Sequence, residues 1–342
     1  MEAAASLPVE SAAVERLRAR RMVTVNRQME VLPGKVAMAT AQLSARGFHV
    51  EQVGGDNPLE WSADDVVWLL GNAAWFPRVC KSIERLPRER RPALVVWHVE
   101  PLPMPSATGM RWPLPTVREL AKIGLRDPRA SDVYTNYWTL RRLRRAGLPD
   151  ALVTISGERQ AFLVEHGFDA AFVPEGYEST DGRDLALDRD IDVLHLGVMH
   201  LHRRRAAVRK LRAAGIAVDA RCSYTDPNLW GEGRTKLLNR AKINLSIARF
   251  PGTFSSKRFL MSMACKALVV SDTLVDPSPY IAGEHFVEAP LDELPRVVER
   301  YLHDEEERLR IAQNGHELVL RELTQERVFG RFLLAVAERV AV

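Results

Sequence analysis

Hydroxyl and basic side chains follow an apolar run in the second half of the chain, with a spacing that suits a phosphate site. The run KINLSIA (242–248) precedes a loop that ends in Ser255 and Ser256, and the sequence KRFLMSMAC, which opens with Lys257 and Arg258, then reads as a helix. Loop amides and the positive end of a helix attract anions, and the two cations supply countercharge. An ordinary helix start with two solvated cations is the alternative.

A second group of this kind follows the run DVLHLG. Gly197 ends that run, His200 follows, and the next helix begins with Arg203, Arg204 and Arg205. Strand-to-helix turns lie at one edge of a parallel sheet, so the two groups can converge on one diphosphate. We therefore predict a phosphate site formed by both turns. His200 is a candidate phosphate contact or acid–base group, although turn histidines more often have no such role.

His98 and Glu100 follow the apolar run ALVVW in the first half of the chain. Side chains alternate along a strand, so these two residues share a face. A histidine or a carboxylate at a strand end can take the proton from an attacking hydroxyl, which makes both candidates for a catalytic base. A hydrogen-bonded pair at the strand end is an equally good interpretation.

Several common catalytic signatures are missing. No glycine-rich run precedes a Lys-Ser/Thr pair, no G-x-G-x-x-G follows an apolar run, and no serine nucleophile elbow is present. Cys80, Cys222 and Cys265 are too far apart for a metal-ligand spacing or a disulfide framework. No Asp-x-Asp stands at the end of an apolar run. We therefore expect no cofactor and no metal.

The elements that would position these residues alternate between apolar runs and helical segments. Strands are predicted at 22–26, 48–53, 64–71, 93–99, 152–156, 170–177, 191–197, 216–222, 242–248, 267–272 and 284–289, and a last helix at 325–341. This alternation predicts an α/β protein with parallel, doubly wound sheets, whose ligands lie beyond the carboxyl ends of the strands. The polar, acidic segment 178–190 suggests the domain boundary.

Length and composition favour a two-domain globular enzyme. The chain has 342 residues, of which 46% are hydrophobic and 27% charged, with a net charge of +4. Basic clusters at 85–91, 141–145 and 203–212 do not require a nucleic-acid partner, and none is expected. Neither a signal peptide nor a membrane span is recognisable, and the unpaired cysteines suit a reducing compartment, so a cytoplasmic location is expected.

The second half of the chain resembles the donor-binding domain of a group 1 type glycosyltransferase of the GT-B fold, with the closest resemblance to the spore-maturation-protein-like branch. The motifs that carry it, in order, are DVLHLG with the following arginines, LLNRAKINLSIA, SSKRFLMSMACKALVVSD, GEHFVEAPLDELPRVVERYL and HDEEERLRIAQNGHELVLRELTQERVFGRFL. The first half resembles the family in its rhythm and in phrases such as TISGERQAFLVEHGF.

The resemblance implies two Rossmann-like domains facing across a cleft. Residues 1–178 would form the acceptor domain, residues 190–323 would bind a nucleotide-diphosphate sugar, and residues 324–342 would form a helix that returns to the first domain. Arg258 would contact the diphosphate with Ser255 and Ser256, joined by one of the arginines 203–205, and Tyr224 would lie near the base. Such a protein would transfer the sugar without an obligatory metal. Arg258 would stabilise the leaving group, and His98 or Glu100 would act as base if the reaction inverts.

The chain departs from the family at three positions. Thr253 and Met261 stand where many members carry glutamates, and Lys266 replaces the usual glycine. A methionine is a poor acceptor for a sugar hydroxyl. A non-catalytic GT-B protein that binds a nucleotide sugar or a partner is therefore the second hypothesis, and an epimerase on the same fold is the third. The nucleotide (UDP, GDP or dTDP), the stereochemistry, the acceptor (glycan, lipid-linked, protein or small molecule) and peripheral membrane or homo-oligomer contacts stay open.

Overall fold

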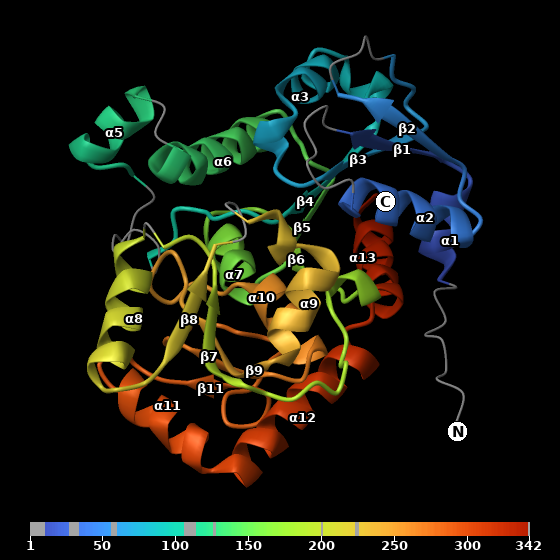
Figure 1. Cartoon of the computed structure of the whole chain (residues 1–342). Coiled ribbons are helices and arrows are strands. Elements are labelled where there is room, and N and C mark those ends of the chain that lie inside the picture. The colour runs from blue at the N-terminus through green and yellow to red at the C-terminus, as the bar shows by residue number, and fades with distance from the viewer. Residues whose placement is uncertain are drawn as a thin grey trace. The chain divides into compact units, whose positions relative to one another are not determined.

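The computed structural model describes residues 11–26, 34–55, 60–105, 114–125, 128–199, 201–222 and 226–340. They divide into two compact units, each built around a parallel sheet (Figure 1). Unit 1 extends to Val173 and resumes at Phe329, and unit 2 runs from Pro174 to Val328. The prediction of two parallel-sheet α/β domains is confirmed. Segment 178–190, which suggested a boundary, lies within unit 2.

The described strands of unit 1 form a six-stranded parallel sheet in the order β2-β1-β3-β4-β5-β6. The strands are β1 (Arg21–Asn26), β2 (Val50–Gly54), β3 (Asp65–Leu70), β4 (Ala93–His98), β5 (Ala151–Thr154) and β6 (Ala170–Phe172). Every residue of β3 and β4 is buried, as expected for parallel strands covered on both faces. Strand β6 ends before Pro174, which cannot donate a ladder hydrogen bond, whereas we predicted a strand to residue 177.

The helices of unit 1 are α1 (Ala12–Arg18), α2 (Gly34–Ala45), α3 (Pro77–Glu84), α5 (Val117–Gly124), α6 (Pro128–Arg145), α7 (Gly157–Glu165) and the larger part of α13 (Gln325–Val340). Helix α2 packs on β1 and β2 and α7 on β5 and β6, whereas α5 contacts α6. Helix α13 begins in unit 2 and belongs to unit 1 from Phe329 onward, so the last helix returns to the first domain as predicted. Its Phe332 ring lies 4.5 Å from the Trp97 ring and 5.4 Å from the Trp68 ring, centroid to centroid.

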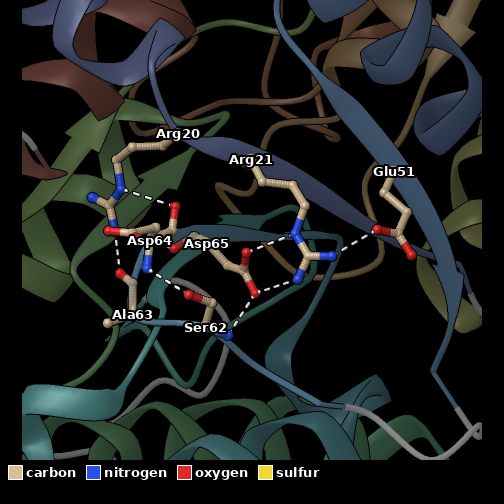
Figure 2. A network of polar contacts seen from close by, with 7 residues as sticks. All are labelled: Arg20, Arg21, Glu51, Ser62, Ala63, Asp64 and Asp65. Carbon is tan, nitrogen blue, oxygen red and sulfur yellow. Dashed lines mark hydrogen bonds and ion pairs between the residues drawn. The ribbon is translucent and has the colours of Figure 1, made fainter.

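An ion-pair network fixes the amino-terminal edge of this sheet (Figure 2). Arg21, the first residue of β1, donates two hydrogen bonds of 2.7 Å to the carboxylate of Asp65, the first residue of β3, and a third to Glu51. The backbone N–H of Ser62 also donates to Asp65. The Asp65 carboxylate is buried, so the bidentate guanidinium and the amide compensate its loss of hydration. The charge of the buried Asp65 carboxylate is thus balanced by Arg21.

Unit 2 contains, among its described residues, a five-stranded parallel sheet in the order β11-β10-β9-β7-β8. Its strands are β7 (Ile191–Leu196), β8 (Val218–Arg221), β9 (Ala241–Ser246), β10 (Leu268–Ser271) and β11 (Val287–Glu288). Its helices are α8 (His202–Ala213), α9 (Gly231–Asn239), α10 (Ser256–Ala264), α11 (Leu294–His303) and α12 (Glu305–Arg321). Glu232, in the first turn of α9, suits the helix dipole. Every helix in the described ranges is too short or too polar to span a membrane.

Candidate functional site

The strand order of unit 2 reverses between β7 and β9. Strand β8 lies on one side of β7, whereas β9, β10 and β11 follow on the other. In open parallel sheets the connections diverge at such a point and leave a crevice at the carboxyl ends of the two strands. Gly197 comes directly after β7, and Ile247 comes directly after β9. The topology therefore places the turn after β7 beside the turn after β9.

Three side chains converge on Gly197. A β-carbon added to this glycine would lie 2.9 Å from Nη2 of Arg258, 3.2 Å from Nη1 of Arg204 and 3.4 Å from Nε2 of His195. The first distance is shorter than a real contact allows, so the guanidinium of Arg258 occupies the space that a side chain would need. The backbone φ of Gly197, +156°, is also one that residues other than glycine rarely adopt. The missing side chain thus lets two cations approach the backbone.

Backbone carbonyls hold the two guanidinium groups in place. The carbonyl oxygen of Ile247 accepts from Nε of Arg204 at 2.9 Å and from Nη1 of Arg258 at 3.0 Å. Arg204 also donates to the carbonyl of Val198 at 3.3 Å. One carbonyl thus orients an arginine from the first turn of α8 and an arginine from the first turn of α10. A carbonyl is a neutral acceptor, so these bonds fix the two groups without cancelling their charge.

The electrostatics of this cluster favour an anion. The pKa of Arg204 is lowered to about 9, first by burial and then by the charge of Arg258, while Asp272 acts in the opposite direction. Arg204 remains charged at neutral pH and is held close to another cation in a poorly hydrated place. An anion over Gly197 would relieve this repulsion and would accept charge-assisted hydrogen bonds.

His195 is the neutral member of the cluster. Its pKa is lowered to about 4, first by burial and then by Arg258, so the ring is uncharged at neutral pH. Nδ1 lies 2.9 Å from the carbonyl oxygen of Leu245 and therefore carries the proton. The buried Nε2, which faces Gly197, has no hydrogen-bond partner among the described residues. The ring thus offers a lone pair beside the arginines.

Two other residues predicted at the start of α10, Ser256 and Lys257, point to a different place. Ser256 donates a hydrogen bond of 2.6 Å to the carboxylate of Glu175, and both side chains are buried. Nζ of Lys257 lies 2.5 Å from the carboxylate of Asp181. Ser255 is the N-cap residue of α10 and makes no capping hydrogen bond through its side chain. Two carboxylates of segment 174–182 therefore bind this helix end, and Arg258 is the cation of α10 that reaches Gly197.

The remaining predicted residues of unit 2 are not among the side chains that converge on Gly197. Arg203 forms an ion pair with Asp272, which is buried at the end of β10 and also accepts from the backbone N–H of Ala248 at 3.3 Å. Arg203 is thus bound to a carboxylate, unlike the carbonyl-bound Arg204. His200 and Tyr224 lie outside the described residues.

His98 and Glu100 belong to unit 1, at the carboxyl end of β4. The His98 ring is 1% exposed, and neither ring nitrogen has a regular hydrogen bond within the described ranges. Burial, followed by the charge of Arg159, lowers its pKa to about 3, while the Glu100 backbone acts in the opposite direction. The backbone N–H of Glu100 donates to the Asn72 side chain at 3.2 Å. A ring that is this deeply buried, with so low a pKa, is a weak base as it stands in this structure.

The two positions that lack the family's glutamates have ordinary structural contacts. The Thr253 hydroxyl donates to the carbonyl of Phe250 at 2.9 Å. Met261 packs against the apolar cluster that contains Leu237 and Cys265. Neither residue offers a carboxylate. The described ranges also contain no group of three or more His, Cys, Asp or Glu side chains arranged to hold a metal ion.

Sequence reasoning missed His195, Asp272, Glu175 and Asp181. His195 had a signal, because it lies two residues before Gly197 in a strand and therefore shares its face. The sequence also held a signal that Arg204, and not Arg203 or Arg205, faces inward. Arg204 continues the helical series of Ala207, Val208 and Leu211, which are all buried in α8. The sequence held no signal for Glu175 and Asp181, because only the folded chain brings their segment to α10.

Comparisons with known proteins agree with this architecture. Residues 200–333 match the family model described as "Glycosyl transferase-like". No curated protein matches the sequence. Sucrose-phosphate synthase from Thermosynechococcus elongatus has a similar structure, with a TM-score of 0.63 and 11% identity over 94% of this chain and 99% of that protein.

Two further solved structures share the fold. HepE from Anabaena, solved with UDP-glucose, gives a TM-score of 0.58 at 9% identity over 94% of this chain and 98% of HepE. TarM gives a TM-score of 0.57 at 7% identity, and the match covers 80% of this chain but only 55% of TarM. The chain therefore has the two-domain fold of the GT-B glycosyltransferases, and its second half matches a glycosyltransferase-like family model.

Proposed function

We propose that the protein transfers a sugar from a nucleotide-diphosphate sugar to an acceptor. The observation that carries this proposal is the convergence of Arg204 and Arg258 on Gly197 at the switch point of unit 2. Glycosyl transfer leaves a nucleoside diphosphate whose negative charge grows as the bond to the sugar breaks. Two oriented guanidinium groups that need no rearrangement would stabilise that charge.

The remaining roles follow from position and chemistry. Arg258 and Arg204 would bind the diphosphate, and Ser255 would contribute a hydroxyl at the start of α10. His200, Arg203 and Tyr224 are further candidates for donor contacts. We assign the transferase to the spore-maturation-protein-like branch on the motif order of its second half. We also propose that it needs no metal, since the arginines supply the countercharge.

His98 and Glu100 are our candidates for the acceptor side. His98 or Glu100 would accept a proton from an attacking hydroxyl if the reaction inverts the anomeric centre, and His98 would need a higher pKa with substrate bound than the buried ring has here. The acceptor would be bound by unit 1, and a glycan, a lipid-linked sugar, a protein or a small molecule would each be compatible with this chemistry.

The proposal is tested by removing one guanidinium at a time. Arg258→Ala and Arg204→Ala should each weaken binding of a nucleoside diphosphate by at least about tenfold, because hydrogen bonds to charged groups contribute roughly 1.5–3 kcal/mol. Calorimetric titration with UDP, GDP, dTDP and CDP measures the effect, and UDP comes first because HepE was solved with UDP-glucose. Arg205→Ala is the matched control, because Arg205 is an exposed arginine of the same helix.

Thermal melting without ligand would show whether each variant is folded. Equal affinity of wild type and Arg258→Ala for every nucleoside diphosphate would refute the site. Equal loss of affinity in Arg205→Ala would mean that general positive charge, and not the Gly197 cluster, attracts the ligand.

A non-catalytic protein that binds a nucleotide sugar is the second candidate. The contacts of Thr253 and Met261 favour it, because neither side chain supplies a carboxylate next to α10. Hydrolysis of the donor in the absence of acceptor separates the two functions. A transferase should release nucleoside diphosphate slowly from at least one nucleotide sugar, whereas a binding protein should be stabilised by that sugar and release none.

A further inference from the structure

A buried carboxylate lies close to the arginine cluster of unit 2. Asp272 directly follows β10, and its side chain is 2% exposed. Its charge reaches the cluster, because it acts to raise the pKa of Arg204. A negative charge at this place weakens the attraction of the cluster for an anion. By its charge alone, Asp272 therefore works against the ligand that the arginines favour.

The contacts of Asp272 join three elements of unit 2. Its Oδ1 accepts a hydrogen bond of 3.3 Å from the backbone N–H of Ala248, and its Oδ2 forms the ion pair with Arg203 in the first turn of α8. The strand pairing of β9 with β10 ends at Ser246 and Ser271. Ala248 lies beyond that pairing, so the carboxylate serves as the partner of its N–H. The Asp272 side chain thus connects β10 to the turn after β9 and to α8.

The N–H of Ala248 and the carbonyl of Ile247 belong to one peptide group. This group is planar and trans, so its N–H and its C=O point in opposite directions. The carbonyl oxygen accepts from Nε of Arg204 at 2.9 Å and from Nη1 of Arg258 at 3.0 Å. A carboxylate that fixes the N–H on one side therefore fixes the direction of the carbonyl on the other side. The hydrogen bond to the carboxylate also polarises the peptide group and makes its carbonyl a stronger acceptor.

We infer that Asp272 is a positioning residue, which directs the two guanidinium groups at Gly197 through the peptide group after Ile247. The inference rests on the proposed diphosphate site and adds to it a residue that acts through the arginines. Without the carboxylate the peptide group can rotate, and the arginines lose the direction of their shared acceptor. Arginines that are not oriented in advance bind an anion more weakly, because binding must then order them.

Two substitutions that remove the same charge test this inference. Asp272→Ala removes the acceptor of the Ala248 N–H, whereas Asp272→Asn keeps a side-chain oxygen that can accept it. The full chain is titrated calorimetrically with whichever of UDP, GDP, dTDP and CDP the wild type binds most tightly. Asp272→Ala should bind this nucleotide at least about fivefold more weakly than the wild type, since the effect is part of a hydrogen bond to a charged group. Asp272→Asn should bind it at least as tightly as the wild type.

Controls separate this role from the role of the charge and from a purely structural role. In the Arg203→Ala chain, where no guanidinium competes for the side-chain oxygen, the two Asp272 variants should keep the same order of affinities. Equally raised affinity in both variants would show that only the charge acts, and lowered melting temperatures with unchanged affinities would show a structural role. Either result would overturn the inference. If Asp272→Ala does not fold, Asp272→Glu replaces it, because it keeps the charge, displaces the oxygens and should also weaken binding.

A double-mutant cycle with Arg258→Ala shows whether Asp272 acts through the arginine. Asp272→Ala should reduce affinity less in the Arg258→Ala chain than in the wild type, and equal reductions would contradict the inference. Equal affinity of the wild type and Arg258→Ala would refute the diphosphate site itself, and the positioning role with it. Weaker binding by Arg258→Ala but not by Asp272→Ala would retain the site and refute the positioning role alone.

Discussion

Both sheets reverse their strand order beside their first strand, between β1 and β3 in unit 1 and between β7 and β9 in unit 2. In unit 2 two guanidinium groups converge there on Gly197. In unit 1 the described residues at the carboxyl edge include the buried Asn72 amide and the buried, neutral His98 imidazole, and Arg159 donates to the carbonyl of Val99 at 2.8 Å. The same topology thus presents two converging guanidinium groups in one unit and a neutral imidazole beside a carbonyl-bound guanidinium in the other. Side chains, and not strand order, decide which ligand chemistry each crevice accepts.

Of the substitutions considered, Gly197→Ala should most strongly reduce the difference between the two edges. The new β-carbon would lie 2.9 Å from Nη2 of Arg258 and would push both arginines away from the backbone. We expect nucleoside diphosphate affinity to fall at least about 100-fold, because two charge-assisted contacts are lost together. Gly215→Ala is the control, since Gly215 also has a positive φ (+81°) but no atom within 4 Å of its added β-carbon. Retained affinity in Gly197→Ala would mean that the ligand does not use the convergence.

The two buried histidines should give the two units a shared dependence on pH. The folded-state pKa is about 4 for His195 and about 3 for His98, below the ordinary value near 6.5. As the pH falls from 6.5 towards these values, the unfolded chain binds a proton and the folded chain does not. Stability therefore falls with falling pH in this window, and is fully present above it.

Replacing either histidine by glutamine should reduce the pH dependence. Between pH 7 and pH 5 the melting temperature of each variant, measured by circular dichroism, should fall by less than that of the wild type. His195→Gln should in addition change the affinity for nucleoside diphosphates, whereas His98→Gln should not. A wild-type melting temperature that is the same at both pH values would contradict the buried, neutral state of the rings.

Lys257→Ala should have the smallest effect on ligand binding. Nζ of Lys257 lies 2.5 Å from the Asp181 carboxylate, so its charge is already balanced within unit 2. We expect nucleoside diphosphate affinity to fall by about threefold or less, the range of a partly exposed ion pair. A loss as large as that of Arg258→Ala in the same titration would show that Lys257 leaves Asp181 to bind the ligand.

The architecture was largely predictable from the sequence because its signals are local. Continuous apolar runs such as that of β4 indicate parallel strands buried on both faces. The helical spacing of Arg204 with Ala207 and Leu211 could also have identified the inward-facing arginine. The end of β6 was misplaced because the strand was predicted through Pro174 to residue 177, although proline is a local stop signal and the ladder ends before it.

The sequence by itself determined which residue types stand in the turns of unit 2, because glycine, serine and arginine at strand-to-helix turns are local features. It indicated that Gly197 and Arg258 lie at the same edge of a sheet. Only the tertiary structure decided which cations remain directed at that edge. Arg203 meets Asp272 and Lys257 meets Asp181, whereas Arg204 and Arg258 share the carbonyl of Ile247. These partners come from distant segments, and local sequence patterns contain no information on contacts of that kind.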